Sequence, residues 1–197
     1  MAPTDDGWTP KNALDQGYGV ICGPPACPDP EAKPGKVAVT LRDLASFHPA
    51  HPTSASEPGG WAVTGLDANF VARAAPQVLN GTLLGHAAQV RFTPVRFRWA
   101  FGDGAERTAA TPGAPWKQLG LPEFSPTATS HVYRDAARYS VVLTVGYSPE
   151  YRLGNAAWQP VAGILDLSAP RFTVIAGDAQ TVLVGRDCVQ SPNGPGC

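Results

Sequence analysis

The stretch Arg98–Gly104, RWAFGDG, decides the fold of this chain because it combines the end of a strand with a tight turn. Apolar residues recur at every second position up to the turn, at Val95, Phe97, Trp99 and Phe101. This period of two is typical of a strand with one buried face. Gly102 and Gly104 allow a sharp turn, and the carboxylate of Asp103 can accept hydrogen bonds from nearby backbone N–H groups. We interpret the turn as a structural corner that fixes the strand carrying Trp99.

The same alternation continues on both sides of this corner. Pro94 interrupts the strand before it, and a proline there predicts a bulge, a bend or an edge position. After the corner, alternation returns in YSVVLTV, residues 139–145, and three strand-length segments follow it: WQPVAGILDL, PRFTVIAGD and QTVLVGRDC. Turn signals about every 8 to 12 residues, with no convincing amphipathic helix, predict an antiparallel β-sandwich.

Two further local patterns carry predictions. KVAVTLRDLASF, residues 36–47, alternates and indicates a strand, although RDLASF within it could form one helical turn. Asn80-Gly81 lies between apolar runs, and this dipeptide predicts a two-residue hairpin turn.

Composition excludes several classes of function. The formal net charge is −1 and no cluster of Lys or Arg exceeds two neighbours, so the basic face that nucleic acid requires is missing. No stretch has the roughly 18 apolar residues of a membrane-spanning helix. The N-terminus lacks the pattern of a signal peptide. Either an export signal has been removed, or the protein is not exported by that route.

The four cysteines are confined to Pro/Gly-rich segments near the two ends, at Cys22, Cys27, Cys188 and Cys197. Four cysteines allow three disulfide pairings. Local pairs are favoured because short loops close at little entropic cost, and a tie between the two ends is the rival. The spacings do not match a zinc site, and no histidine is near either pair in sequence. Disulfides would place the chain in an oxidising compartment, outside the cell or on its surface.

These patterns divide the chain into three parts. Residues 1–36 hold seven prolines and are predicted to be an irregular arm. Residues 37–187 form the predicted sandwich, with a long loop at 105–130, and residues 188–197 form a tail bounded by cysteines.

The motifs WAFGDG, HVY and YSVVLTV, in this order, resemble the PKD (polycystic kidney disease) domain family. The resemblance is specific over residues 88–146. It implies an Ig-like antiparallel β-sandwich, here with extra strands and the Pro-rich N-terminal arm. The loop after the corner is longer than in the family, and Arg138 stands where the family has glycine, which implies a different turn conformation there. The whole also resembles secreted PKD-containing proteins of high-GC Gram-positive bacteria.

The motif residues are expected to be structural: Trp99, Phe101, Gly102, Asp103, Gly104, His131, Tyr133 and Tyr139. Trp99 should pack between the sheets, His131 should hydrogen-bond near the turn, and Tyr133 should pack while its hydroxyl finds a backbone partner. Calcium at Asp103 is disfavoured, because only Glu106 is a nearby oxygen donor in sequence. His48, His51 and Glu57 could be imagined as a metal trio, but they are expected to be solvated loop residues. No catalytic motif is present, so we expect no enzyme, no cofactor and no metal.

The first hypothesis is a non-catalytic interaction module, extracellular or on a cell surface, that binds protein or glycan. Exposed aromatic residues would carry the binding, and the candidates are Trp116, Phe124, Tyr147, Tyr151 and Trp158. For each of them, ordinary packing is the competing interpretation. The second hypothesis is a structural subunit of a surface assembly such as a pilus, a sheath or a virion decoration. A third is an accessory domain of a secreted hydrolase.

Overall fold

The computed structural model describes residues 38–179 and 188–189. The predicted all-β class is confirmed, since almost every regular element is a strand. In chain order the elements are η1 (Leu41–Leu44), β1 (Thr53–Glu57), β2 (Trp61–Val63), β3 (Asp67–Arg73), β4 (Gln77–Leu83), β5 (His86–Ala100), β6 (Glu106–Ala109), α2 (Trp116–Leu119), β7 (His131–Val132), β8 (Arg138–Leu153), β9 (Gln159–Pro160), β10 (Leu165–Ser168) and β11 (Phe172–Gly177).

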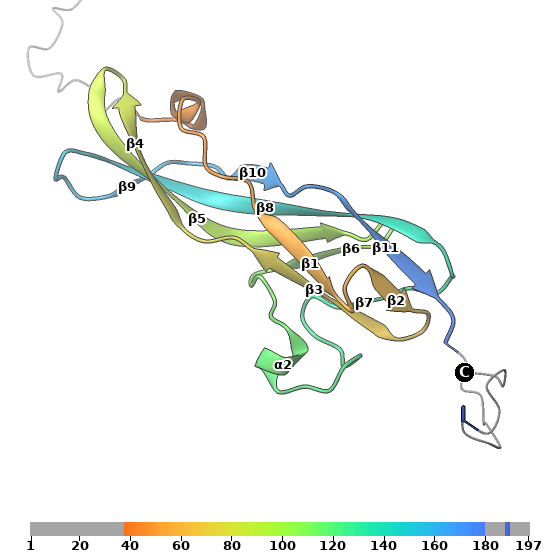
Figure 1. Ribbon diagram of the computed structural model, residues 1–197. Coiled ribbons are helices and arrows are strands. Elements are labelled where there is room, and N and C mark those ends of the chain that lie inside the picture. Colours follow the sequence, from red (N-terminus) through yellow and green to blue (C-terminus); the bar gives the residue numbers. More distant parts are fainter. Residues whose placement is uncertain (1–37, 180–187, 190–197) are drawn as a thin grey trace, which may run out of the picture. The chain divides into compact units, whose positions relative to one another are not determined.

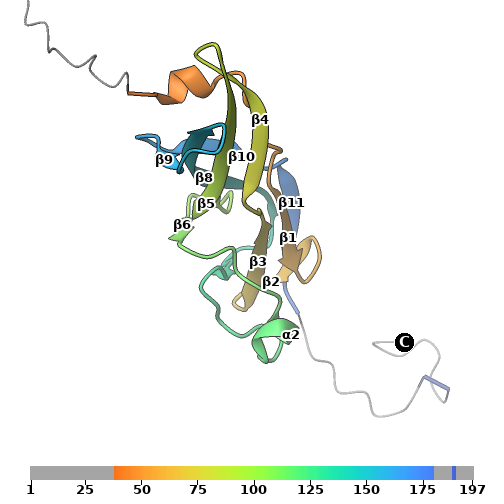
Figure 2. The ribbon, with the colours of Figure 1, turned by 90° about the vertical axis from the view of Figure 1, so that its left-hand side faces the viewer.

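The strands form two sheets. A 3-stranded sheet has the order β1-β3-β7, and an 8-stranded sheet has the order β2-β11-β8-β5-β4, with β6 paired to β5 and both β9 and β10 paired to β8. All described pairs are antiparallel except β2 with β11. Figures 1 and 2 show β1 and β3 crossing one face of the long β5–β8 pair. This face is the inner face of the sandwich, and we call the opposite one the outer face.

A bulge in β5 keeps one face of this strand pointing inward along its whole length. Pairing with β8 shifts register between Pro94 and Arg96, as the proline predicts, and Val95 is the extra residue, 43% exposed. Because the bulge adds one residue, the inward positions change from even to odd. The buried residues of β5 are Ala88, Val90 and Phe92 before the bulge, and Phe97 and Trp99 after it.

The core of the sandwich forms around Phe70 of β3. Its ring centroid lies 5.5 Å from that of Trp99 and 5.0 Å from that of Phe101. Trp99 is 0% exposed, so the expected indole between two layers is present. Burying a large apolar side chain of this kind contributes about 1.5–3 kcal/mol. Contacts between these rings therefore join the two sheets next to the corner.

The predicted turn at Asn80-Gly81 is wrong. Both residues lie inside β4, and the chain turns instead at Leu84 and Gly85, whose φ angles are 49° and 83°. Gly81 has another role, because a Cβ there would lie 2.7 Å from the Phe47 ring. The glycine makes room for an aromatic ring that packs into the core.

The predicted strand at residues 36–47 is also wrong for the residues described, from Ala38 onward. The chain there forms the single 3-10 turn η1, and Asp43 accepts hydrogen bonds from the backbone N–H and hydroxyl of Thr40. The following residues are tied to β4 by Gln77, whose side-chain amide bonds both the N–H and the C=O of Ala50. A side chain thus replaces the strand pairing that the alternation predicted.

The long loop after the corner is more ordered than its composition indicates, because it contains β6 and α2. Asn69 of β3 is fully buried and anchors the loop. Its amide donates to the carbonyl of Ala114 and to Glu57, and its oxygen accepts from the Thr127 hydroxyl at 2.8 Å. Buried polar groups need such partners, so the loop is fixed to the sandwich.

β8 runs farther than expected, through Pro149 to Leu153. The proline is tolerated because it lies between the residues that pair with β10 and those that pair with β9, where its missing N–H breaks no ladder bond. Of the three segments predicted after residue 145, WQPVAGILDL contributes β9 and β10, and PRFTVIAGD forms β11.

Several predictions fall outside the described residues. These are the arm at residues 1–36, most of the predicted strand QTVLVGRDC, and most of the tail at residues 188–197. Cys22, Cys27 and Cys197 also lie outside the described residues. Cys188 is described and is not a free thiol, but the pairing of the cysteines stays a prediction. Within the described part of the chain, no helix is long and apolar enough to cross a membrane.

Candidate functional site

The corner after β5 has the geometry that its two glycines require. Gly102 and Gly104 have φ angles of 90° and 93°, a region that is costly for residues with a Cβ. Between them, Oδ1 of Asp103 accepts a hydrogen bond of 3.0 Å from the N–H of Ala105. The carboxylate thus closes the turn on itself, as the sequence predicts.

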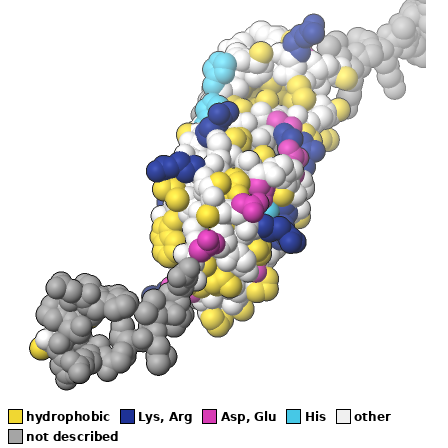
Figure 3. All heavy atoms as spheres, turned by 90° about the vertical axis from the view of Figure 1, so that its right-hand side faces the viewer, with side chains coloured by type: hydrophobic (Ala, Val, Ile, Leu, Met, Phe, Trp, Pro, Cys, Tyr) yellow, Lys and Arg dark blue, Asp and Glu magenta, His cyan; other side chains and the backbone are white. Residues whose placement is uncertain are grey.

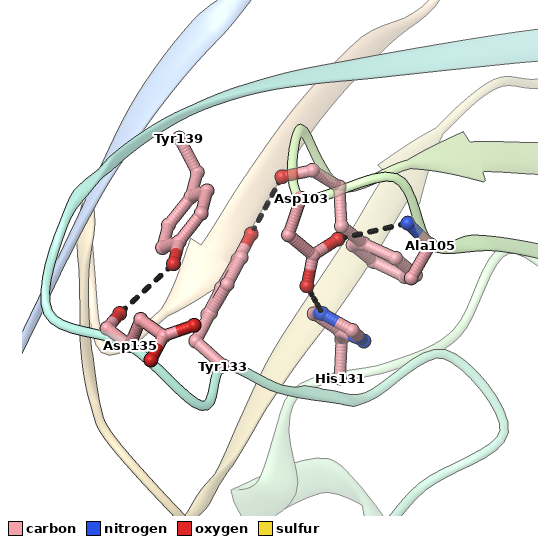
Figure 4. A network of polar contacts seen from close by, with 7 residues as sticks. Asp103, Ala105, His131, Tyr133, Asp135 and Tyr139 are labelled. Atoms are coloured by element: carbon pink, nitrogen blue, oxygen red, sulfur yellow. Dashed lines mark hydrogen bonds and ion pairs between the residues drawn. The ribbon is translucent and has the colours of Figure 1, made fainter.

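His131 connects this corner to β7. Its Nε2 lies 2.6 Å from Oδ2 of Asp103, and its ring stacks on Phe101 with centroids 4.1 Å apart (Figure 4). The expected hydrogen bond near the turn is therefore present. One end of the imidazole is fixed by the carboxylate of Asp103 and one face by the ring of Phe101.

Tyr133 completes the cluster on the inner side. Its buried hydroxyl donates to the carbonyl of Phe101 at 3.1 Å, which is the backbone partner that the sequence predicts. The ring stacks on Tyr139 at 4.4 Å, and the Tyr139 hydroxyl donates to the carbonyl of Asp135 at 2.9 Å. Burial raises the pKa of the Tyr133 hydroxyl, and the nearby charge of Asp103 adds to this effect. Tyr133 therefore stays protonated as a donor.

The electrostatics of Asp103 suit a structural role. Partial burial acts to raise its pKa, but the hydrogen bonds from Ala105 and His131, together with the charge on His131, outweigh burial and hold this pKa below its usual value. Both carboxylate oxygens already have protein partners. Among the described residues, no group of three or more His, Cys, Asp or Glu could hold a metal ion.

The imagined metal trio is not assembled. His51 contacts the carbonyl of Ser168 through Nδ1 at 2.9 Å, while Glu57 accepts from the backbone N–H of Trp116 and from Asn69. His48 and His51 instead border an apolar cavity of about 210 Å³ between η1 and the sheet.

Arg138 occupies the first position of β8. It is not among the described non-glycine residues with positive φ, which are Leu84 and Phe124. The turn before β8 therefore does not adopt the left-handed conformation that a glycine would permit, as the resemblance implies. The arginine is exposed and pairs with Ile175 of β11.

Trp116 is not available as an exposed binding residue. It is 4% exposed, its indole N–H donates to the carbonyl of Ser125 at 2.8 Å, and its ring contacts Phe124. Packing of the loop explains both aromatic residues, because the indole forms the centre of the loop. We correct the prediction for Trp116 on this ground.

The candidates on β8 also face inward. Tyr147 is 0% exposed and belongs to the core. Tyr151 pairs with Val90 and packs against the core, with its hydroxyl 3.2 Å from Oε1 of Gln159. Neither ring is presented to solvent as a flat surface.

Trp158 is the one predicted aromatic residue that joins a charged cluster on the outer face. The guanidinium carbons of Arg91 and Arg152 lie 4.5 and 4.7 Å from the centroid of its ring. Arg91 also donates through Nε and one terminal nitrogen to Glu150, at 3.0 and 2.7 Å. Cation–π contacts of this kind contribute about 0.5–1 kcal/mol each at exposed sites. Trp158 thereby holds the segment before β9 on the sheet.

Two amides extend this cluster across the sheet. Nε of Arg152 donates to Oε1 of Gln89 at 2.6 Å, and Nε2 of Gln89 donates to Oδ1 of Asn80 at 2.8 Å. The bonded pairs come from β8, β5 and β4, which are neighbours in the sheet. We call this set the Trp158 cluster: Asn80, Gln89, Arg91, Glu150, Arg152 and Trp158. Figure 3 shows acidic and basic side chains intermixed over one side of the molecule, without a broad field of one sign.

The sequence analysis missed a second outer-face group at the opposite end of the sheet. Trp61 of β2 is 48% exposed and pairs with Ile175 of β11, which is 44% exposed and pairs in turn with Arg138. The sequence analysis predicted a strand in PRFTVIAGD but named no exposed residue in it. Which strands become neighbours depends on the parallel β2–β11 pairing, and no local pattern signals this pairing.

No family model matches the chain, and no curated protein matches it.

Proposed function

We propose that this chain is a non-catalytic interaction module of the PKD type, extracellular or on a cell surface, that binds protein or glycan. The Trp158 cluster is the observation that supports this proposal best. It presents two guanidinium groups and two amides on strands, together with an aromatic ring that these arginines hold on the sheet just before β9. Tryptophan and arginine are the residues that most often dominate binding energy at interfaces.

Pre-organisation strengthens this interpretation. The salt bridge to Glu150 and the hydrogen bond to Gln89 fix the two arginines before any partner arrives. Ordering such side chains on binding costs about 0.5–1.5 kcal/mol each. Because these arginines are already ordered in the folded protein, part of this cost does not weaken binding. The corner at Asp103 has a structural role in this proposal and contacts no partner.

A binding screen tests the proposal. The intact protein and Trp158→Ala are passed over immobilised glycans and cell-wall fractions, with Trp61→Ala as a matched loss of a surface indole elsewhere. We expect retention that Trp158→Ala weakens by about tenfold and that Trp61→Ala leaves nearly unchanged. Equal retention of all three proteins on every surface, or no retention, would overturn it.

A structural subunit is the second candidate, and the row of Trp61, Ile175 and Arg138 favours it. Two exposed apolar side chains beside a guanidinium form a small patch suited to a neighbouring subunit. Light scattering over a concentration series tests this role. Self-association that Ile175→Ser abolishes and Trp158→Ala preserves would support it, whereas a monomer at all concentrations would exclude self-assembly through this row.

A further inference from the structure

We propose that the Trp158 cluster binds an acidic polysaccharide, with Arg152 as the principal contact to its anionic groups. This inference rests on the proposed binding function and narrows its partner to one chemical class. Three independent features of the cluster support it: the local balance of charge, the free hydrogen-bonding groups and the fixed orientation of the arginines.

The first feature is an excess of positive charge. Arg91 and Arg152 lie over the same indole, and Glu150 is the single carboxylate bonded within the cluster. Two cations and one anion leave a local charge of +1, although the whole chain carries a formal charge of −1. Glu150 is bonded by Arg91, so the uncompensated cation is Arg152. A ligand that supplies a negative charge completes the pair.

The second feature is the type of hydrogen-bonding group that remains free. Arg152 uses Nε for Gln89, and its terminal nitrogens have no acceptor among the described residues. The amide nitrogen of Asn80 is likewise free of acceptors in the described part of the chain, since Asn80 accepts through Oδ1. A guanidinium fork matches a carboxylate or sulfate, and a neighbouring amide N–H matches a sugar oxygen.

One acceptor also remains, and it fits a carbohydrate. Both hydrogen bonds from Arg91 go to Oε2 of Glu150, which leaves Oε1 without a partner among the described side chains. Sugar hydroxyls can donate to such an oxygen. A ligand that carries anionic groups and hydroxyls together would use every free group of the cluster.

The third feature is orientation. Trp158 contacts the guanidinium groups of Arg91 on β5 and Arg152 on β8, so these two like charges are held close together over one indole ring. Repulsion between them is offset by the π-face of the indole and by Glu150. Trp158 is therefore a positioning residue here, and Arg152 contacts the ligand directly.

The test uses the full-length protein and three polymers. Polygalacturonate carries a carboxylate on each sugar, its methyl ester has the same backbone without these charges, and dextran sulfate carries sulfate instead. We expect polygalacturonate to bind and its methyl ester to bind at least tenfold more weakly. Comparison with dextran sulfate identifies which anion the cluster prefers. Binding should weaken as salt rises from 0.05 to about 0.5 M, because exposed charges are screened.

Variants locate the binding on the surface. Arg152→Gln should lower the affinity for the acidic polymer by about tenfold, the effect of losing charge-assisted hydrogen bonds. Arg98→Gln is the matched control, since Arg98 is an exposed arginine of β5 outside the cluster. Trp158→Ala should weaken binding and Trp158→Phe should restore most of it, because phenylalanine keeps a π-face.

Two outcomes would overturn the inference. If Arg152→Gln and Arg98→Gln weaken binding equally, the polymer responds to net charge and the cluster is not a site. If the methyl ester binds as tightly as the acid, the module binds glycans without selecting charge, so the proposed function stands and this inference fails. Circular dichroism of each variant confirms that the fold is retained.

Discussion

The imidazole of His131 lies 2.6 Å from the carboxylate of Asp103, a residue 28 positions earlier in the chain. Asp103 lies within the corner that follows β5 of the 8-stranded sheet, whereas His131 belongs to β7 of the 3-stranded sheet. This contact therefore bridges the two layers at their rim. The stacking of His131 on Phe101 places the same bridge directly over the core.

Asp103→Asn is expected to destabilise the protein most at neutral pH. The pKa of Asp103 is lowered in the folded state, so the folded protein favours the carboxylate. Its contribution is present at a pH above the usual value for aspartate and is lost as the pH falls through the lowered pKa. Urea unfolding from pH 7 to pH 2 should therefore show a smaller loss of stability on acidification in the variant than in the wild type.

Asp135→Asn is the control for this comparison. Asp135 accepts from Tyr139 through its backbone carbonyl, so the substitution leaves that hydrogen bond intact. Its acid-induced loss of stability should follow the wild type. Parallel curves for Asp103→Asn and the wild type would show that the bridge does not depend on the charge of Asp103.

Tyr133→Phe and Tyr147→Phe make the same chemical change at two fully buried tyrosines with opposite expectations. Tyr133→Phe removes the donor to Phe101 and should cost about 1–3 kcal/mol, because a buried carbonyl loses its partner. The Tyr147 hydroxyl has no hydrogen-bond partner of normal geometry among the described residues. Burial raises its pKa and Gln77 offsets part of this shift, yet both polar atoms of Gln77 already bond Ala50.

Tyr147→Phe should therefore leave the free energy of unfolding unchanged or increase it. Denaturant unfolding of the two variants under the same conditions measures the difference. Equal losses would mean that the Tyr147 hydroxyl is satisfied by a group such as water, and the contrast between the two sites would disappear.

Gly102→Ala and Gly104→Ala separate backbone strain from crowding. Both residues have positive φ angles, which for alanine cost about 1–2 kcal/mol. At Gly104 a Cβ would meet nothing within 4 Å, whereas at Gly102 it would lie 2.7 Å from the backbone nitrogen of Ser140. Gly102→Ala should lower the melting temperature clearly more than Gly104→Ala does. Equal shifts would mean that the contact with β8 yields without cost.

The parts of the fold that follow from local sequence were predictable. Alternation identified the cores of β5 and β8, Pro94 indicated the bulge, and the glycines around Asp103 indicated the corner. The contacts of His131 and Tyr133 followed from the family resemblance of the motifs. For the strands, the bulge and the corner, the determining residues are close together in sequence, whereas His131 lies 28 positions from Asp103.

The errors arise where tertiary contacts overrule local preference. Asn80-Gly81 has the composition of a turn, but the space that Phe47 needs places Gly81 inside a strand, against that ring. Trp116 lies in a Pro/Ala/Thr-rich loop that predicts exposure, yet the buried Asn69 draws the loop onto the sandwich. The Trp158 cluster required the register of β4, β5 and β8, which the sequence does not specify.

Trp116→Ala is expected to release the long loop without removing a binding surface. The indole is buried, and its N–H donates to the carbonyl of Ser125, which follows α2 in the chain. Loss of a buried tryptophan typically costs about 3–5 kcal/mol in a core, but a surface loop can detach locally, so the global effect should be smaller. Trypsin cleavage after Lys117 reports this local opening, and we expect it to accelerate at least tenfold while the β-sheet circular dichroism persists.

Trp158→Ala removes an indole elsewhere and should leave this cleavage unchanged. Weaker binding to a partner by Trp116→Ala, with wild-type cleavage at Lys117, would contradict the assignment of this side chain to loop packing.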